Sequence, residues 1–326
     1  MSEVDQAPRN ASAFRHEALL YAGEDEFLAG TVPFIEEGLE REETVLVVVS
    51  ASKIDALRHT LQHTFPHTSN LAAGAVQFAD MAEIGRNPAC IIPAWRDFVN
   101  QNGGGTRPLR GIGEPMSTHL SDAAITECHR HESLLNLAFA DTRDWWLLCP
   151  YDTSTLSAQV VAEAHRTHPF LFENGHHMTS PWARDPSVIS APFEDPLPEP
   201  PPNTPALTFD AAGLAAVRTR VRDLGAKARL RATRLADLVL AADEVATNSV
   251  RHGGGRGTLR VWLDDRAVVC DVRDAGRLDD PMVGRRRPRI DQIGGRGLWL
   301  VNQLCELVQI RSSKAGTTVR LHVERG

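Results

Sequence analysis

DEVATN at residues 243–248 is the first of four short motifs, and it is followed by DAG at 274–276, GGRGL at 294–298 and GTT at 316–318. Each motif alone is common. In this order they predict a helix, the end of a strand, a glycine-rich loop before a second helix, and a closing strand. Such a set can form an ATP site, because it combines oxygen ligands for a cation with backbone groups that approach phosphates.

The first motif lies on a helix predicted over 235–252. Glu244, Asn248 and His252 are spaced four apart and therefore form a row along this helix. Asn248 can supply a neutral oxygen ligand to Mg²⁺, and Glu244 can orient or deprotonate an attacking hydroxyl. The alternative is a helix face that is simply solvated.

The second motif follows a strand predicted over 267–273. A carboxylate at Asp274 can accept a hydrogen bond from an adenine amino group, and Gly276 lets the backbone stay close to the ring. The alternative is an ordinary Asp-x-Gly turn. The basic loop 284–289 comes next, and it can close over a triphosphate or face solvent or a partner.

The third motif precedes an apolar helix predicted over 298–304. Glycines before a helix let the backbone approach an anion, which the free N–H groups at the helix start then bind. The loop has neither the ending of a Walker A motif nor the surroundings of a dinucleotide fingerprint. The fourth motif opens a strand predicted over 319–323 and places a hydroxyl at the floor of the site.

This order of motifs resembles the GHKL ATPase fold of histidine kinases, gyrase and Hsp90, and more narrowly the small ATPase domains of bacterial anti-sigma factors that phosphorylate serine. The resemblance runs from Ala206 to the end of the chain and implies an α/β sandwich that binds ATP and Mg²⁺. It assigns nucleotide contacts to Asn248, Asp274, Gly276, Gly295, Arg296, Gly297 and Thr318.

The same resemblance implies a role for each position. Asn248 would hold Mg²⁺, Glu244 would be the catalytic base, and Asp274 would read adenine. The loop residues 295–297 would lie along the phosphates, and Thr318 would support the Asp274–adenine contact. The family's second motif continues to another glycine, but this chain has Leu278 there, which places nucleotide affinity in question.

A proline-rich segment at 179–205 precedes the ATPase motifs and contains nine of the 20 prolines. We interpret it as a stiff linker, because proline disrupts helices and favours extended chain. A histidine kinase would need a helical hairpin with a phosphoacceptor His at this point. The pairs His16-Glu17 and His131-Glu132 lie far from it, so a histidine kinase is the less favoured alternative.

The bulk properties agree with a two-domain cytoplasmic protein. The 326-residue chain carries a net charge of −7, which gives no general case for nucleic-acid binding. We expect no membrane span and no signal peptide. The five cysteines form no CxxC pair and are interpreted as reduced core thiols. Residues 1–13 are predicted to be disordered.

Residues 14–178 alternate predicted strands and helices, which favours a doubly wound parallel sheet. The segment 44–49 is almost continuously apolar, as expected of a strand covered on both faces. HEALLY at 16–21 and LCPYD at 148–152 make this region similar to the MEDS sensory domain, a relative of RecA-like folds. The resemblance implies a small-molecule signal. The loop 22–25 has no Walker lysine.

Two features of this half could suggest additional chemistry. His129 and His131 are two residues apart and therefore point to different helix faces, which disfavours a shared metal. Cys149 ends a predicted strand and is interpreted either as a packed core cysteine or as a sensing thiol.

We therefore expect a cytoplasmic regulator in which residues 14–178 receive a signal and residues 206–326 act on protein partners. The anti-sigma resemblance implies that the ATPase domain binds a sigma factor and phosphorylates a Ser or Thr of an anti-sigma antagonist. The alternative is a module that docks to a partner without catalysis. The sequence is compatible with a homodimer and names neither the partners nor the signal.

Overall fold

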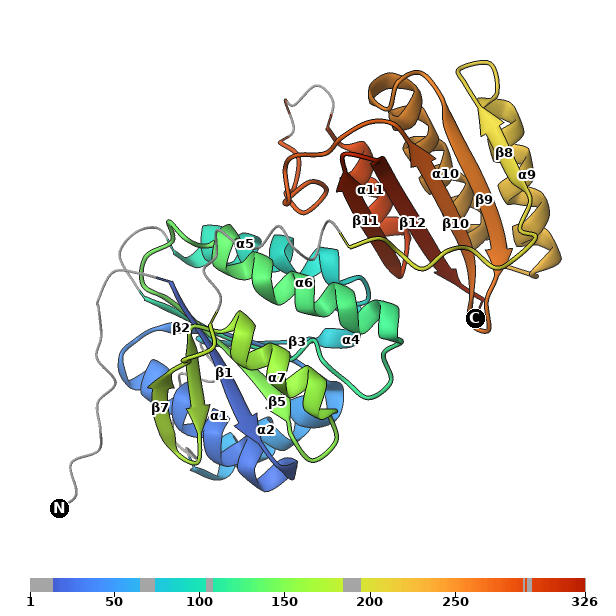
Figure 1. Cartoon of the computed structure of the whole chain (residues 1–326). Helices are drawn as coiled ribbons and strands as arrows, with labels where there is room; N and C mark the ends of the chain where they lie inside the picture. The colour runs from blue at the N-terminus through green and yellow to red at the C-terminus, as the bar shows by residue number, and fades with distance from the viewer. Residues whose placement is uncertain are drawn as a thin grey trace. The chain divides into compact units, whose positions relative to one another are not determined.

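The computed structural model describes residues 14–64, 74–103, 108–183, 195–289, 291 and 295–325. The chain separates into two compact units, Met1–Ile189 and Ser190–Gly326 (Figure 1). This separation falls within the predicted linker 179–205, and the finer domain boundaries stay a prediction. The predicted disorder of 1–13 concerns residues outside the described ranges. No helix in the described ranges is both long enough and apolar enough to cross a membrane.

The N-terminal unit contains a seven-stranded sheet in the order β3-β2-β4-β5-β1-β6-β7. The strands are β1 (Arg15–Tyr21), β2 (Thr44–Val49), β3 (Val76–Asp80), β4 (Leu109–Gly113), β5 (Trp145–Asp152), β6 (Phe170–Glu173) and β7 (His176–Thr179). All neighbouring strands are parallel except β6 and β7, which form an antiparallel hairpin.

Helices cover both faces of this sheet. Figure 1 shows α1 and α2 on one face and α5 and α6 on the other. The helices are α1 (Gly23–Glu40), α2 (Ala51–Thr64), α4 (Met81–Ile84), η1 (Pro88–Cys90), α5 (Ile91–Asn102), α6 (Asp122–Ala138) and α7 (Ala158–Thr167). Phe27, Ile35 and Leu57 pack on the buried side chains of β2. The predicted doubly wound α/β fold is confirmed.

The C-terminal unit contains a five-stranded antiparallel sheet in the order β11-β12-β10-β9-β8. The strands are β8 (Ala206–Phe209), β9 (Gly257–Leu263), β10 (Ala267–Asp274), β11 (Leu307–Ser313) and β12 (Gly316–Glu324). The helices are α9 (Leu214–Lys227), α10 (Ala232–His252) and α11 (Gly297–Leu304). All three helices contribute to one core with the sheet, through side chains such as Val221, Leu238 and Val301. The predicted α/β sandwich is confirmed.

The sheet face that lies opposite the helices is polar, and part of the predicted linker covers it. Asp271 is fully buried there, and its Oδ2 accepts hydrogen bonds from Arg320 Nε at 3.0 Å and Nη2 at 2.8 Å. Arg320 Nη2 also donates to Pro198 O at 2.8 Å, and Glu199 pairs with Arg273 at 3.1 Å. Residues 197–199 are therefore packed on the sheet and are not a free spacer.

We expect Asp271→Ala to lower the free energy of unfolding by about 3–5 kcal/mol, because it leaves the buried Arg320 guanidinium without its carboxylate. Urea unfolding of the full chain, followed by circular dichroism, measures this change. Asp279→Ala is the matched control, since Asp279 and Arg277 form an ion pair that is mostly exposed. Equal losses in the two variants would contradict the expectation.

Candidate functional site

A cavity of about 200 Å³ lies in the C-terminal unit where α10, the end of β10, the start of α11 and β12 converge. Its apolar wall is formed by Val245, Leu278, Val283, Leu298 and Val319. The other lining residues are Asn248, His252, Gly253, Asp274, Gly276, Arg277, Gly295, Gly297 and Thr317. The structure therefore gathers five of the predicted site residues, Asn248, Asp274, Gly276, Gly295 and Gly297, around one cavity.

The polar row of α10 meets the first residue of α11. The apolar stripe of α10, which includes Leu238, Ala242 and Val245, is buried against the sheet, so Glu244 and Asn248 lie at the edge of the core. A methyl group added at Gly297 would come within 2.9 Å of Glu244 Oε2 and 3.1 Å of Asn248 Nδ2. A larger residue there would displace the ends of these two side chains, so glycine lets α11 begin in contact with them.

Asp274 is fixed on both of its carboxylate oxygens. Ser249 Oγ donates to Oδ2 at 2.6 Å, and the backbone N–H of Gly276 donates to Oδ1 at 2.8 Å. Each oxygen keeps a lone pair that can accept a further hydrogen bond. A methyl group at Gly276 would lie 2.8 Å from both Gly253 Cα and His252 O. The end of α10 and the turn after β10 thus approach each other at backbone distance.

The hydroxyl at the floor of the cavity belongs to Thr317 and not to Thr318. Thr317 Oγ1 donates to Gly276 O at 2.9 Å and lies 3.0 Å from Ser312 Oγ. Side chains alternate between the two faces of a strand, so Thr318 points away from this cavity. The role predicted for Thr318 was therefore wrong in position by one residue, because the sequence does not show the register of β12 against β10.

The residues before α11 divide between the cavity and the solvent. Gly295 lines the cavity with a φ of 71°, which is a left-handed conformation that favours glycine. Arg296 is exposed, and its Nη2 donates to Arg289 O at 3.2 Å. The side chain of Arg296 is not among those that line the cavity, in contrast to its predicted place beside Gly295 and Gly297. Gly294 of the same motif lies outside the described residues.

Leu278 occupies the position where the related family has a glycine, and the chain accommodates it without strain. Its φ is not positive, and its backbone N–H donates to Ser312 Oγ at 2.8 Å. The side chain lines the cavity and packs against the core of the unit. Leu278 therefore adds to the apolar wall, and the basic loop that follows is anchored where Asn302 Nδ2 donates to Gly284 O at 2.9 Å.

Three residues that shape this site are not among the predicted site residues. Ser249 orients Asp274, Gly253 lets the end of α10 contact Asp274, and Thr317 holds the turn at Gly276. Gly253 directly follows the helix, which is a recognisable helix-end signal. Ser249 and Thr317 could not be distinguished from their neighbours, because their roles depend on contacts between segments far apart in the sequence.

The arrangement suits a nucleotide with its metal ion. An apolar slot that ends in the fixed carboxylate of Asp274 can receive a purine ring with an amino group. The start of α11 offers backbone N–H groups to phosphates, Asn248 has an amide oxygen that can bind Mg²⁺, and Glu244 has a carboxylate that can accept a proton. The donor set of these residues therefore fits Mg²⁺ and ATP.

Comparisons with known proteins cover both units. Residues 15–169 match the MEDS family, described as the methanogen/methylotroph, DcmR sensory domain, and residues 207–323 match the histidine kinase-like ATPase domain. No curated protein matches the chain.

Among solved structures, the RsbU and RsbW domains of Rv1364c from Mycobacterium tuberculosis align with 23% identity and a TM-score of 0.28 over 38% of this chain. The alignment spans about a third (34%) of that chain. The two family matches fall separately on the two compact units. This chain accordingly combines an N-terminal MEDS sensory domain with a C-terminal histidine kinase-like ATPase domain.

Proposed function

We propose that the C-terminal domain binds Mg²⁺-ATP in the cavity beside α10 and transfers the γ-phosphoryl group to a Ser or Thr hydroxyl of a protein partner. The observation that carries this proposal is the contact of Glu244 and Asn248 with the start of α11 at Gly297. Two groups suited to phosphoryl transfer thus lie at a helix N-terminus suited to phosphate.

In this proposal the adenine lies in the apolar slot and its amino group donates to Asp274. Ser249 and the Gly276 N–H keep the carboxylate in place, and Thr317 keeps the turn closed beneath it. The phosphates extend toward Gly295 and Gly297, where the backbone is free of side chains. Arg296 is exposed and would contact phosphate only after leaving Arg289 O.

For the transfer step, Glu244 accepts the proton of the attacking hydroxyl. The hydroxyl oxygen forms a bond to the γ-phosphorus, the bond from that phosphorus to the β–γ bridging oxygen breaks, and ADP leaves. Mg²⁺ held by Asn248 would neutralise charge on the phosphates. Glu244 is only partly buried, so a partner's hydroxyl could reach it.

We further propose that the protein partners are a sigma factor, which the domain would sequester, and an anti-sigma antagonist, which it would phosphorylate. The MEDS domain would receive a small-molecule signal that changes this choice. These assignments follow from the motif resemblance and from the joining of a sensory domain to an ATPase domain. A cytoplasmic location is part of the same proposal.

A second candidate is a partner-docking module that binds ATP without using it. Leu278 favours this candidate, because a leucine that packs into the core restrains the turn where the related family has a glycine. The catalytic and the docking candidates share the cavity and differ only in whether Glu244 acts as a base.

We expect Thr317→Ala to weaken Mg²⁺-ATP binding on the order of tenfold, because it removes the hydrogen bond that holds the turn at Gly276. Thr318→Ala is the matched control and should bind as the wild type does. Asn248→Ala should also remove the dependence of binding on Mg²⁺. Calorimetry on the full chain measures all three, and equal affinities for the two threonine variants would contradict the site.

We expect Glu244→Gln to keep its affinity for Mg²⁺-ATP and to lose about 10²- to 10⁴-fold in phosphoryl transfer, because the amide cannot accept the proton. The assay follows ADP formation and phosphoserine or phosphothreonine, by mass spectrometry, with purified candidate antagonists. ATP binding without transfer in the wild type would support the docking module. Transfer that Glu244→Gln leaves unchanged would exclude Glu244 as the base.

A further inference from the structure

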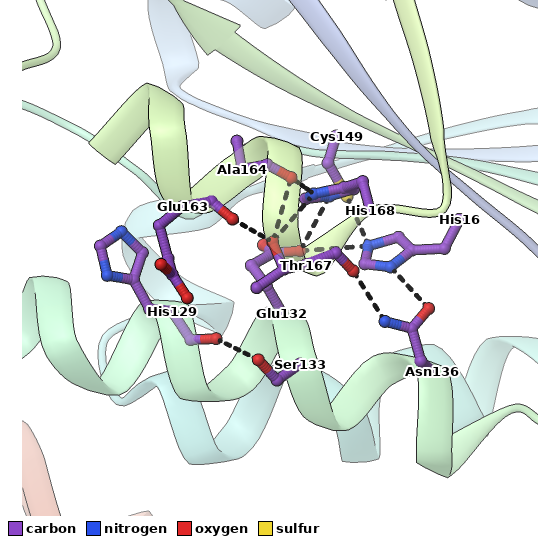
Figure 2. A network of polar contacts seen from close by, with 10 residues as sticks. All are labelled: His16, His129, Glu132, Ser133, Asn136, Cys149, Glu163, Ala164, Thr167 and His168. Carbon is purple, nitrogen blue, oxygen red and sulfur yellow. Dashed lines mark hydrogen bonds and ion pairs between the residues drawn. The ribbon is translucent and has the colours of Figure 1, made fainter. Parts of the chain in front are cut away.

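A second group of converging polar side chains lies in the N-terminal unit and has no part in the proposed kinase chemistry. It consists of His16 on β1, Glu132 on α6, Cys149 on β5 and His168 directly after α7 (Figure 2). All four residues are buried, and one nitrogen, oxygen or sulfur atom from each lies within 4.8 Å of the others. We call these residues the buried cluster.

Hydrogen bonds outside the buried cluster fix the tautomer of both histidines. His168 Nδ1 lies 2.9 Å from Ala164 O, which can only accept, so Nδ1 carries the proton. Asn136 Nδ2 donates to Thr167 O at 2.8 Å, so its Oδ1 faces His16 Nδ1 at 3.1 Å and accepts from it. Both Nε2 atoms are thereby left to turn a lone pair into the buried cluster.

Four acceptor atoms consequently face one another. His16 Nε2 and His168 Nε2 lie 3.1 and 3.3 Å from Glu132 Oε2, and Cys149 Sγ lies 3.4 Å from His16 Nε2. In a tetrahedral zinc site with bonds of 2.0–2.3 Å, neighbouring ligand atoms are roughly 3.3–3.8 Å apart. These three separations are close to those of such a site, and the other pairs of ligand atoms lie within 4.8 Å of each other.

The other buried carboxylates of the described residues show what is unusual about Glu132. Each of the others has an arginine or lysine beside it: Glu17 with Arg15, Glu43 with Arg110, Glu114 with Lys53, Glu127 with Arg130 and Asp271 with Arg320. Glu132 instead has two imidazoles and the Cys149 thiol around it, and its Oε1 makes no hydrogen bond. An ionised carboxylate in such a place requires a cation.

A proton does not provide that cation well. The hydrogen bond from His16 Nδ1 to Asn136 Oδ1 leaves Nε2 of the neutral ring without a proton to share with Glu132. His168 Nε2 lies near the carboxylate but makes no hydrogen bond, so a proton placed on it would not be well directed. The positions of both rings suit lone pairs that share one centre.

We propose that His16, Glu132, Cys149 and His168 bind one transition-metal ion of the Zn²⁺ class. Two imidazoles, one carboxylate and one thiolate are ligands that such ions accept. Asn136 and Ala164 O would orient the two rings by their hydrogen bonds to Nδ1, as outer groups commonly do at metal sites. The Cys149 thiol would lose its proton to solvent as the metal–sulfur bond forms.

The site would connect four elements of the sensory domain that are far apart in sequence. Residue 16 lies on β1, residue 132 on α6, residue 149 on the neighbouring β5, and residue 168 between α7 and β6. Metal binding would therefore stabilise the folded domain and could be detected without any measurement of kinase activity.

Cobalt provides the test, because Co²⁺ occupies zinc sites and reports its ligands by absorption. The full chain is treated with a chelator and titrated with Co²⁺. We expect a stoichiometric end point, a thiolate-to-cobalt charge-transfer band, and a higher melting temperature. Protein purified from zinc-supplemented medium should contain about one metal ion per chain by elemental analysis. Absence of both the band and the bound metal in the wild type would overturn the proposal.

The variants identify the ligands. Cys149→Ser should lose the charge-transfer band, whereas Cys128→Ser should keep it, since Cys128 is equally buried but its Sγ lies 3.8 Å from Pro115 O, outside the buried cluster. His168→Gln should weaken binding at least tenfold. The cobalt titration of the wild type decides by itself whether the metal site exists. A variant that fails to fold therefore does not affect the test. A band that persists in Cys149→Ser would place the metal elsewhere.

Discussion

The close contact between α10 and the start of α11 is the constraint on which the candidate ATP site depends. The apolar face of α10 must pack on the sheet, and this fixes the rotation of the helix and brings Glu244 and Asn248 to one edge of the core. Gly297 then allows α11 to begin within contact distance of both side chains. A shift of α10 by one residue would separate Glu244 and Asn248 from the start of α11.

The second half of the site depends on the same packing at the other end of α10. The helix ends at His252, so Gly253 and the turn at Gly276 meet at backbone distance, and Ser249 reaches Asp274. The two ends of the candidate site, at Asp274 and at Gly297, are thus positioned by one helix, which gives a fixed distance between them. A nucleotide that spans both ends would therefore stabilise α10 as well as the turn and α11.

The sequence predicted the elements that carry strong periodic patterns and missed those that do not. The apolar runs of β2 and β5 and the helix over 235–252 were predicted because burial imposes a repeating pattern on them. The hairpin β6–β7 was missed because its strands are only four residues long and β7 is mostly polar, and β8 and β9 were missed because their pairing is set by tertiary contacts.

For the candidate site, the residue types and their order could be predicted from the sequence. The sequence did not show that Thr317 faces the cavity or that Arg296 is exposed, because strand register and loop path appear only in three dimensions.

The buried cluster shows even more strongly that contacts between segments far apart in the chain cannot be predicted from the sequence. The spacing of His129 and His131 disfavoured a shared metal, since residues two apart on a helix face different ways, and Cys149 was interpreted as either a packed core cysteine or a sensing thiol. Neither argument addresses ligands that come from four separate elements. The informative feature is the charge around each buried carboxylate. Among the described residues, every other buried carboxylate has a guanidinium or ammonium partner, whereas Glu132 faces two imidazole lone pairs and a thiol. Burial of an uncompensated negative charge costs several kcal/mol, and the proposed metal ion at the centre of the buried cluster would offset this cost.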